Sequence, residues 1–377
     1  MIYLDNAATS FPKAPGVVDA TVHFMTEVGA NAGRGSHRLA REASHRLFDV
    51  RERCAAFLGI QQPERLAFTK HATEALNLVL MGQVPVGGTV VLSSLEHNAV
   101  MRPLRHLEET RGIRLIVVPF DACGRPDPSA LRESLALRPD LFVLTAASNV
   151  TGCLPPLEEI AALCRKNNVP LCVDASQAVG HVPITVEDID FLCFSGHKGL
   201  MGPMGTGGLY VAPSFHPAPL LRGGTGSLSE SEHQPTFMPD CYEAGTQNLS
   251  GLAGLLPALD FINATGLDHI HAQETALCDH LLAGLLALPG ITSPGPAIGA
   301  KRAPVVSISV DDRDLGEIAL EFDRRDIALR LGLHCAPAAH RSIGTFEAGG
   351  TLRFSPGFFT TKDEIDTTIQ AMKEILT

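Results

Sequence analysis

Between about residues 65 and 212, short apolar runs alternate with amphipathic stretches. Several runs are almost continuously apolar, as at 141–144, and such strands are usually buried on both faces of a parallel sheet. Amphipathic stretches such as 157–166 supply the helices between them. The alternation predicts a layered α/β domain, whose ligands bind beyond the carboxyl ends of the strands. We expect strands at residues 65–69, 89–93, 114–119, 141–146, 170–174, 191–195 and 208–211.

The pattern changes after about residue 258. A helical stretch at 269–288 is followed by a Pro/Gly-rich segment at 289–303 and by strand-like runs at 305–310 and 351–355. A capping-box pattern at 361–364 then predicts the start of a final amphipathic helix. We therefore expect two domains. Residues 16–257 would form the large α/β domain, and residues 1–15 with 258–377 a smaller α+β domain.

Composition excludes several classes of protein. The 377 residues carry a net charge of −11, which argues against a nucleic-acid partner. No stretch reaches the roughly 18 uninterrupted apolar residues of a membrane span, and the first residues lack the pattern of a secretory signal. Nine cysteines without a C-x-x-C pair favour a reduced, cytoplasmic protein without a metal site. We expect eight of these thiols to be buried.

Two residues at strand ends carry the first chemical signal. Lys198 follows Asp174 by 24 positions, and each comes at or just after the end of an expected strand. A deprotonated lysine amine can form a Schiff base, and a carboxylate can pair with a protonated pyridine nitrogen. Alone, each residue would more often be a solvated loop or turn residue. Their coincidence in one βαβ stretch favours a site for pyridoxal phosphate (PLP).

Four motifs then closely resemble the class V aminotransferase family of PLP enzymes, and within it the cysteine desulfurase / selenocysteine lyase branch. The motifs are LDNAAT at 4–9, EHNA at 96–99, VDASQA at 173–178 and SGHK at 195–198. They occur in the family's order, and the resemblance runs from residue 4 to about residue 366. It implies PLP-dependent transferase fold type I, with a mostly parallel sheet in the large domain and a smaller α+β domain.

The resemblance also implies which residues hold the cofactor ring. Lys198 would bind PLP through its amine, and Asp174 would pair with the pyridine N–H. Gln177 would donate to the phenolic oxygen of the ring. His97 would stack on the ring and help to move protons, although a packed or surface imidazole is the alternative reading.

The cofactor phosphate would lie at the start of a helix. Such a helix start offers free backbone N–H groups to an anion. The resemblance implies that Ala72, Thr73, Ser195 and His197 bind the phosphate, together with a threonine of the neighbouring subunit. Thr246, in the segment 243–248, matches that threonine. The resemblance therefore implies a homodimer with a shared active site.

Three further residues concern the substrate. Arg353 resembles the family's arginine for the substrate carboxylate, which a guanidinium binds with two parallel hydrogen bonds. Asn149 would face the substrate or the ring oxygen, although a turn before Gly152 explains it equally well. Cys335 ends the Arg-x-Gly-x-His-Cys pattern of the desulfurases. Its small, polar or cationic neighbours favour an exposed, reactive thiol.

The expected function is a cysteine desulfurase. L-Cysteine would give L-alanine and a Cys335 persulfide, which is passed to a sulfur acceptor. Selenocysteine lyase, a PLP-dependent aminotransferase or epimerase, and a non-catalytic sulfur-pathway scaffold remain as alternatives. Two features leave the acceptor open: Leu333 stands where many relatives have a second histidine, and the segment 336–350 resembles the short-loop branch.

Overall fold

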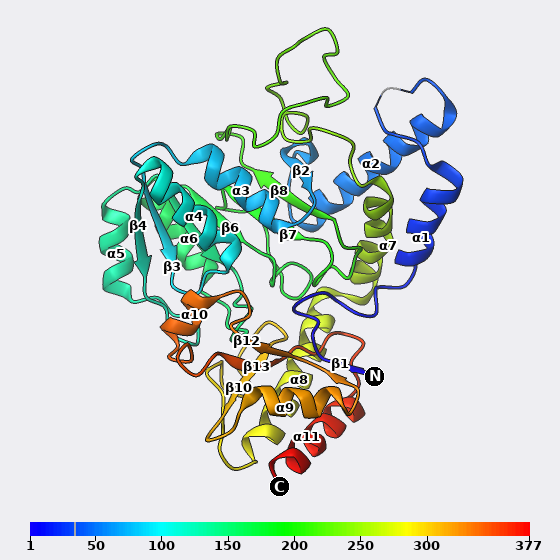
Figure 1. Cartoon of the computed structure of the whole chain (residues 1–377). Helices are drawn as coiled ribbons and strands as arrows, with labels where there is room; N and C mark the ends of the chain where they lie inside the picture. The colour runs from blue at the N-terminus through cyan, green and yellow to red at the C-terminus, as the bar shows by residue number, and fades with distance from the viewer. Residues whose placement is uncertain (34) are drawn as a thin grey trace.

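The computed structural model describes residues 1–33 and 35–377. A seven-stranded sheet with helices on both faces forms one part of the molecule, and a four-stranded sheet with its own helices forms the other (Figure 1). Both chain termini lie in the part with the smaller sheet (Figure 1). The short strand β1 (Ile2–Tyr3) pairs there in parallel with β11 (Ile327–Ala328), so the first residues belong to this smaller part.

The large sheet confirms the predicted α/β architecture. Its strand order is β2-β8-β7-β6-β5-β3-β4. All neighbours are parallel except that β8 is antiparallel to both β2 and β7. No helix separates β7 from β8, so the chain turns back directly and pairs in the opposite direction. The strands are β2 (Leu66–Thr69), β3 (Thr89–Ser93), β4 (Arg114–Val118), β5 (Leu141–Thr145), β6 (Leu171–Asp174), β7 (Phe191–Ser195) and β8 (Gly207–Val211).

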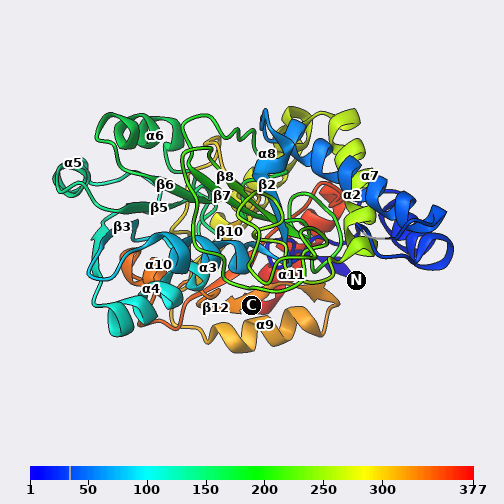
Figure 2. The same cartoon turned by 90° about the horizontal axis from the view of Figure 1, so that it is seen from above.

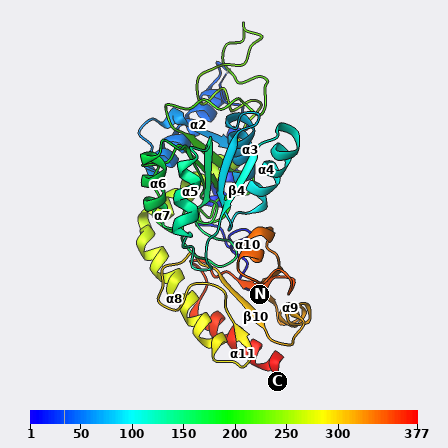
Figure 3. The same cartoon turned by 90° about the vertical axis from the view of Figure 1, so that its left-hand side faces the viewer.

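Both faces of this sheet are covered, which explains the continuous apolar runs. In β5, Leu141 and Val143 belong to the core beneath α3 and α4, whereas Phe142 and Leu144 belong to the core on the opposite face. Figure 3 shows α3 and α4 on one side of the strands and α6 and α7 on the other. The helices are α2 (Arg38–Phe57), α3 (Ala72–Gln83), α4 (Asn98–Arg111), α5 (Pro128–Ala136), α6 (Leu157–Lys166) and α7 (Leu249–Thr265).

At one end of the sheet, α1 (Val17–His23) and α2 pack against α7, and α5 lies at the opposite end (Figure 2). The predicted boundary between residues 257 and 258 falls inside α7, so this helix continues through it. The division into 16–257 and 1–15 with 258–377 stays a prediction. Among the described residues, no helix combines the length and the apolarity that crossing a bilayer requires.

The smaller part has an antiparallel sheet in the order β12-β13-β10-β9. Apolar side chains of that sheet pack against α8, α9 and α11 and form the hydrophobic core of the smaller part. The predicted capping box is present, because Thr361 and Glu364 exchange side-chain and backbone hydrogen bonds at the start of α11. The elements are α8 (Leu267–Leu286), β9 (Ile291–Thr292), β10 (Val306–Val310), α9 (Leu315–Asp323), β12 (Arg330–Gly332), α10 (Pro337–Ser342), β13 (Thr351–Phe354) and α11 (Lys362–Leu376).

Candidate active site

The predicted site residues meet at the carboxyl edge of the large sheet. Asp174 is the last residue of β6, and Ser195 is the last residue of β7. Strand register places Asp174 between Thr145 of β5 and Cys193 of β7. Lys198 lies in the turn that follows β7. Parallel pairing therefore brings together groups that are separated along the chain.

Asp174 has the environment that a cationic ring nitrogen requires. Its side chain is only 3% exposed. One carboxylate oxygen, Oδ1, accepts hydrogen bonds from the Ser176 backbone N–H at 3.0 Å and from the Ser176 hydroxyl at 2.5 Å. These bonds fix the carboxylate and leave Oδ2 for a ligand. A buried, oriented carboxylate of this kind fits a protonated pyridine nitrogen.

Lys198 has the electrostatics of a nucleophilic amine. Burial lowers the pKa of the Lys198 ammonium below its ordinary value. The carboxylate of Asp174 opposes this shift, and the guanidinium of Arg353 adds to it. A lowered pKa raises the fraction of neutral amine near pH 7, which is the form that attacks a carbonyl.

The phosphate-binding residues meet at the start of α3. The backbone N–H of Ala72, the first residue of α3, donates to Ser195 Oγ at 3.0 Å. Thr73 follows Ala72 and is exposed. His197 Nδ1 lies 3.1 Å from Thr9 Oγ1, and burial lowers the pKa of His197 to about 4. A helix start, a hydroxyl and an imidazole together form a cradle suited to a phosphate.

Gln177 follows Asp174 by three residues, and His97 lies near enough to Asp174 to feel the charge of its carboxylate. The buried Gln177 side chain uses its Nε2 to donate to the carbonyl of Ala7 at 2.8 Å, and its second amide hydrogen can serve a ligand. His97 is the N-cap of α4, where its Nδ1 accepts from the Ala99 N–H at 3.0 Å. Burial lowers the pKa of His97 to about 4, so the imidazole is neutral and carries its proton on Nε2.

Arg353, on β13, is buried at the boundary between the two sheets. Only 1% of this residue is exposed. Its guanidinium donates to the carbonyl of Asn149 at 3.1 Å and to the Asp5 carboxylate at 2.8 Å. Its Nε is buried and has no hydrogen-bond partner within residues 1–33 and 35–377. Asn149 in turn donates through Nδ2 to the His334 carbonyl at 2.7 Å. A guanidinium with a donor to spare is suited to an incoming carboxylate.

Cys335 is exposed, as predicted, in the short connection between β12 and α10. His334 and Cys335 have φ values of 47° and 57°, in the left-handed region that costs non-glycine residues about 1–2 kcal/mol each. Fixed contacts hold this conformation: the Asn98 N–H donates to the Cys335 carbonyl at 2.8 Å, and His334 Nε2 lies 3.0 Å from Thr351 Oγ1. The thiol is therefore presented by an ordered loop.

Three site residues escaped the sequence reasoning. The guanidinium of Arg330 lies 3.7 Å from Cys335 Sγ, and Asp5 pairs with Arg353. Glu96 is completely buried, and desolvation raises its pKa to about 8. Its Oε1 accepts from the Ser93 hydroxyl at 2.5 Å and from the Thr145 N–H at 2.8 Å. Each of the three lies inside a motif quoted above, which is the only signal that the sequence offered.

Two sequence expectations need comment. Thr246 is exposed and borders a pocket of about 190 Å³ whose lining residues, such as Lys70 and Glu74, do not include Ser195. Its role across a subunit boundary stays a prediction. The expectation that eight cysteines are buried is wrong in one case, because Cys123 is exposed. This residue lies in the tight turn 121–124, where a short side chain has no core to reach.

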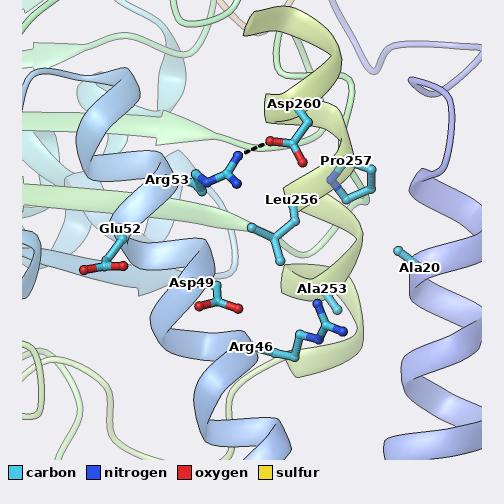
Figure 4. A pocket seen from close by; sticks show the side chains of 9 residues that line it. All are labelled: Ala20, Arg46, Asp49, Glu52, Arg53, Ala253, Leu256, Pro257 and Asp260. Carbon is cyan, nitrogen blue, oxygen red and sulfur yellow. Dashed lines mark hydrogen bonds and ion pairs between the residues drawn. The ribbon is translucent and has the colours of Figure 1, made fainter. Parts of the chain in front are cut away.

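A larger cavity, of about 540 Å³, lies between α1, α2 and α7 (Figure 4). It contains none of the predicted site residues. Its charged groups are partly neutralised by the ion pair between Arg53 and Asp260 (Figure 4). Among the described residues, no Lys, Cys, Ser, Thr or His side chain lines it. This cavity therefore does not carry the predicted chemistry. Among the described residues, no cluster of three or more His, Cys, Asp or Glu side chains is arranged to hold a metal ion.

Known proteins resemble this chain in both sequence and fold. The probable cysteine desulfurase of Methanothermobacter thermautotrophicus is 32% identical over 382 residues, covering 99% of this chain and 94% of its own. The cysteine desulfurase of Enterobacter sp. is 34% identical over 386 residues, covering 100% and 93%.

The apo structure of cysteine desulfurase from Thermococcus onnurineus NA1 superimposes with a TM-score of 0.92 at 32% identity, covering 99% of this chain and 94% of that one. The cysteine desulfurase CsdA of Escherichia coli, in an S-sulfonic acid form, gives 0.89 at 28% identity with the same coverage. The family model described as aminotransferase class-V matches residues 2–368. This chain belongs to the class-V aminotransferase family.

Proposed function

We propose that this protein is a PLP-dependent cysteine desulfurase, which converts L-cysteine to L-alanine and leaves the sulfur on Cys335. One observation carries the proposal: an exposed thiol lies in the same site as a partly buried lysine, a buried aspartate and a buried arginine. The two sequence relatives and the two structural neighbours above, which carry the same activity in their names, support it.

The residues at the sheet edge fit the cofactor. Lys198 would hold it covalently, Asp174 Oδ2 would accept from the ring nitrogen, and Gln177 would donate to the ring oxygen. The N-terminus of α3 with Ser195 and His197 would hold the phosphate. When bound, PLP supplies an electron sink that stabilises negative charge at the Cα of an amino acid. This requires a protonated ring nitrogen, which the carboxylate of Asp174 favours.

Lys198 and Arg353 would act on the amino-acid substrate. Arg353 would bind the substrate carboxylate, and its Nε, which has no hydrogen-bond partner among the described residues, would be one of the donors. Lys198, whose pKa is lowered by burial, would be a neutral amine able to take the Cα proton of the substrate. The same ammonium later returns a proton to the product.

Cys335 would take the sulfur. Its thiolate attacks the substrate sulfur, so an S–S bond forms while the substrate C–S bond breaks. The bonding pair of the C–S bond remains on carbon, which is protonated to give the methyl group of L-alanine. The balance is L-cysteine plus Cys335 thiol to L-alanine plus Cys335 persulfide, with no external oxidant. An acceptor thiol then removes the sulfane sulfur.

Further parts of the proposal concern assembly and location. Thr246 would reach the phosphate cradle of a second subunit, which would make the homodimer the active form. The exposed position of Thr246, on a loop outside its own cradle, supports this. We also propose that the protein works in the cytoplasm, where its unpaired cysteines would stay reduced.

The test is L-alanine formation from L-cysteine in the presence of a thiol reductant, with the parent protein and Cys335→Ala compared. We expect alanine only from the parent and PLP absorbance in both. Alanine from both proteins would remove Cys335 from the mechanism. If neither forms alanine but both release selenide from selenocysteine, the selenocysteine lyase activity replaces the desulfurase. Keto acid or racemised product would instead indicate an aminotransferase or epimerase.

A further inference from the structure

The N-terminal segment crosses the loop that carries Lys198. The carbonyl of His197, the residue before this lysine, faces several donors from that segment. The Ser10 N–H lies at 2.9 Å, the Ser10 hydroxyl at 3.1 Å and Lys13 Nζ at 3.3 Å. A carbonyl oxygen has two lone pairs, so these three donors already saturate it.

Thr9 makes the contact with the imidazole itself. Its Oγ1 lies 3.1 Å from His197 Nδ1, 3.2 Å from the His197 carbonyl and 3.2 Å from Lys13 Nζ. An ammonium only donates, so Lys13 uses one lone pair of Oγ1. The single hydroxyl proton of Thr9 can then go to the carbonyl or to Nδ1. Because the carbonyl already has three other donors, we assign the proton to Nδ1.

This assignment determines the state of the other ring nitrogen. When Nδ1 accepts a hydrogen bond in a neutral imidazole, Nε2 carries the proton. The imidazole is neutral because burial, with Lys198 and Lys13 adding to the effect, lowers the pKa of His197 to about 4. Burial also lowers the pKa of Lys13 to about 8, which leaves it mainly charged at pH 7. A cation that donates to Oγ1 polarises the hydroxyl into a better donor.

We propose that Lys13 and Thr9 are positioning residues that hold His197 in its Nε2–H tautomer, so that Nε2 donates a hydrogen bond to the phosphate at the start of α3. The inference rests on the proposed PLP site, because it assigns a role within the phosphate cradle. It gives a function to a half-buried lysine that makes no ion pair among the described residues.

A direct role is the competing explanation for Lys13. Its charge could attract the phosphate through space, without any effect on the imidazole. The two explanations differ in their dependence on His197. A tautomer effect vanishes when the imidazole is removed, whereas a direct charge effect persists. Thr9 separates them as well, because removing its hydroxyl changes no charge.

The experiment measures the dissociation constants of PLP and of pyridoxal, which lacks the phosphate, for the full-length apoprotein. We expect Thr9→Val and Lys13→Met to weaken PLP binding roughly threefold to tenfold, the size of one net hydrogen bond, and to leave pyridoxal binding unchanged. Thr9→Ser keeps the hydroxyl and should bind PLP like the parent. Ser10→Ala, which removes a hydroxyl from the same carbonyl but not from the imidazole, is the matched control.

The decisive arm repeats Thr9→Val and Lys13→Met in a His197→Ala background, where neither should weaken PLP binding further. Further loss with Lys13→Met in that background would overturn the tautomer role in favour of direct attraction. Parent-like PLP binding by Thr9→Val would overturn the inference while leaving the proposed function intact. If the parent binds PLP no more tightly than pyridoxal, the phosphate cradle and the proposed function fail together.

Discussion

The two halves of the site are built in different ways. Lys198 and Asp174 stand at or just beyond the ends of neighbouring strands, over a core that covers both faces of the sheet. Arg353 and Cys335 come from the smaller part and are positioned by a few polar contacts, including an ion pair between residues 348 positions apart. The cofactor half is thus held on a sheet that apolar packing covers on both faces, whereas the substrate half depends more on hydrogen bonds between distant segments. Substitutions in the two halves should therefore affect cofactor binding and substrate turnover differently.

The largest effect is expected in the cofactor half. Lys198→Ala removes the covalent anchor and the base, so alanine formation should fall by at least about 10³-fold, within the range of general base catalysis. Turnover rate and circular dichroism would be measured together. A variant that folds normally and keeps even a tenth of the parent rate would contradict the assigned role.

In the substrate half, Arg353→Lys should raise the KM for L-cysteine by about 10²-fold, because an ammonium cannot reproduce the planar fork of the guanidinium. PLP affinity should stay within about twofold of the parent, which separates the two halves. Steady-state kinetics and a PLP titration on the same preparation test this. A fall in PLP affinity as large as the rise in KM for L-cysteine would mean that the two halves of the site are not independent.

A smaller effect is expected at Arg330, whose guanidinium lies 3.7 Å from the sulfur of Cys335. Arg330→Met keeps most of the aliphatic part of the side chain but removes the positive charge beside the Cys335 sulfur. The rate of persulfide formation should fall by about tenfold, the value of one charge-assisted contact, with little change in KM. Single-turnover alanine formation would measure it. An unchanged rate would show that the short loop alone activates the thiol.

The smallest effect concerns the pH dependence of stability. Desolvation raises the pKa of Glu96 from 4.5 to about 8, so the native state keeps a proton that the unfolded chain releases. The stabilisation by the protonated form is complete below about pH 4.5 and is lost as the pH rises towards 8. Glu96→Gln removes this titration. Urea midpoints at pH 5 and pH 8 should differ less in the variant than in the parent; an equal difference would show that Glu96 does not titrate in this window.

The sequence alone determined the positions of the large-sheet strands and the residues at their ends. Apolar runs identify buried strands, and parallel pairing aligns their carboxyl ends, so the sequence predicts Asp174 and Ser195 at the same edge of the sheet. The motif resemblance then predicted the family, which is confirmed. These features depend on local patterns a few residues long, namely the spacing of apolar residues within each segment and the short motifs.

Only the tertiary structure decided which side chains touch across long separations. The direction of β8, the pairing of Asp5 with Arg353, the left-handed loop at Cys335 and the contact of Lys13 with Thr9 and His197 have no periodic signature. They follow from how whole layers pack and from where buried polar groups find partners. A local pattern shows that a residue is polar and lies near an edge. The partner that satisfies it is fixed only when the distant segments meet.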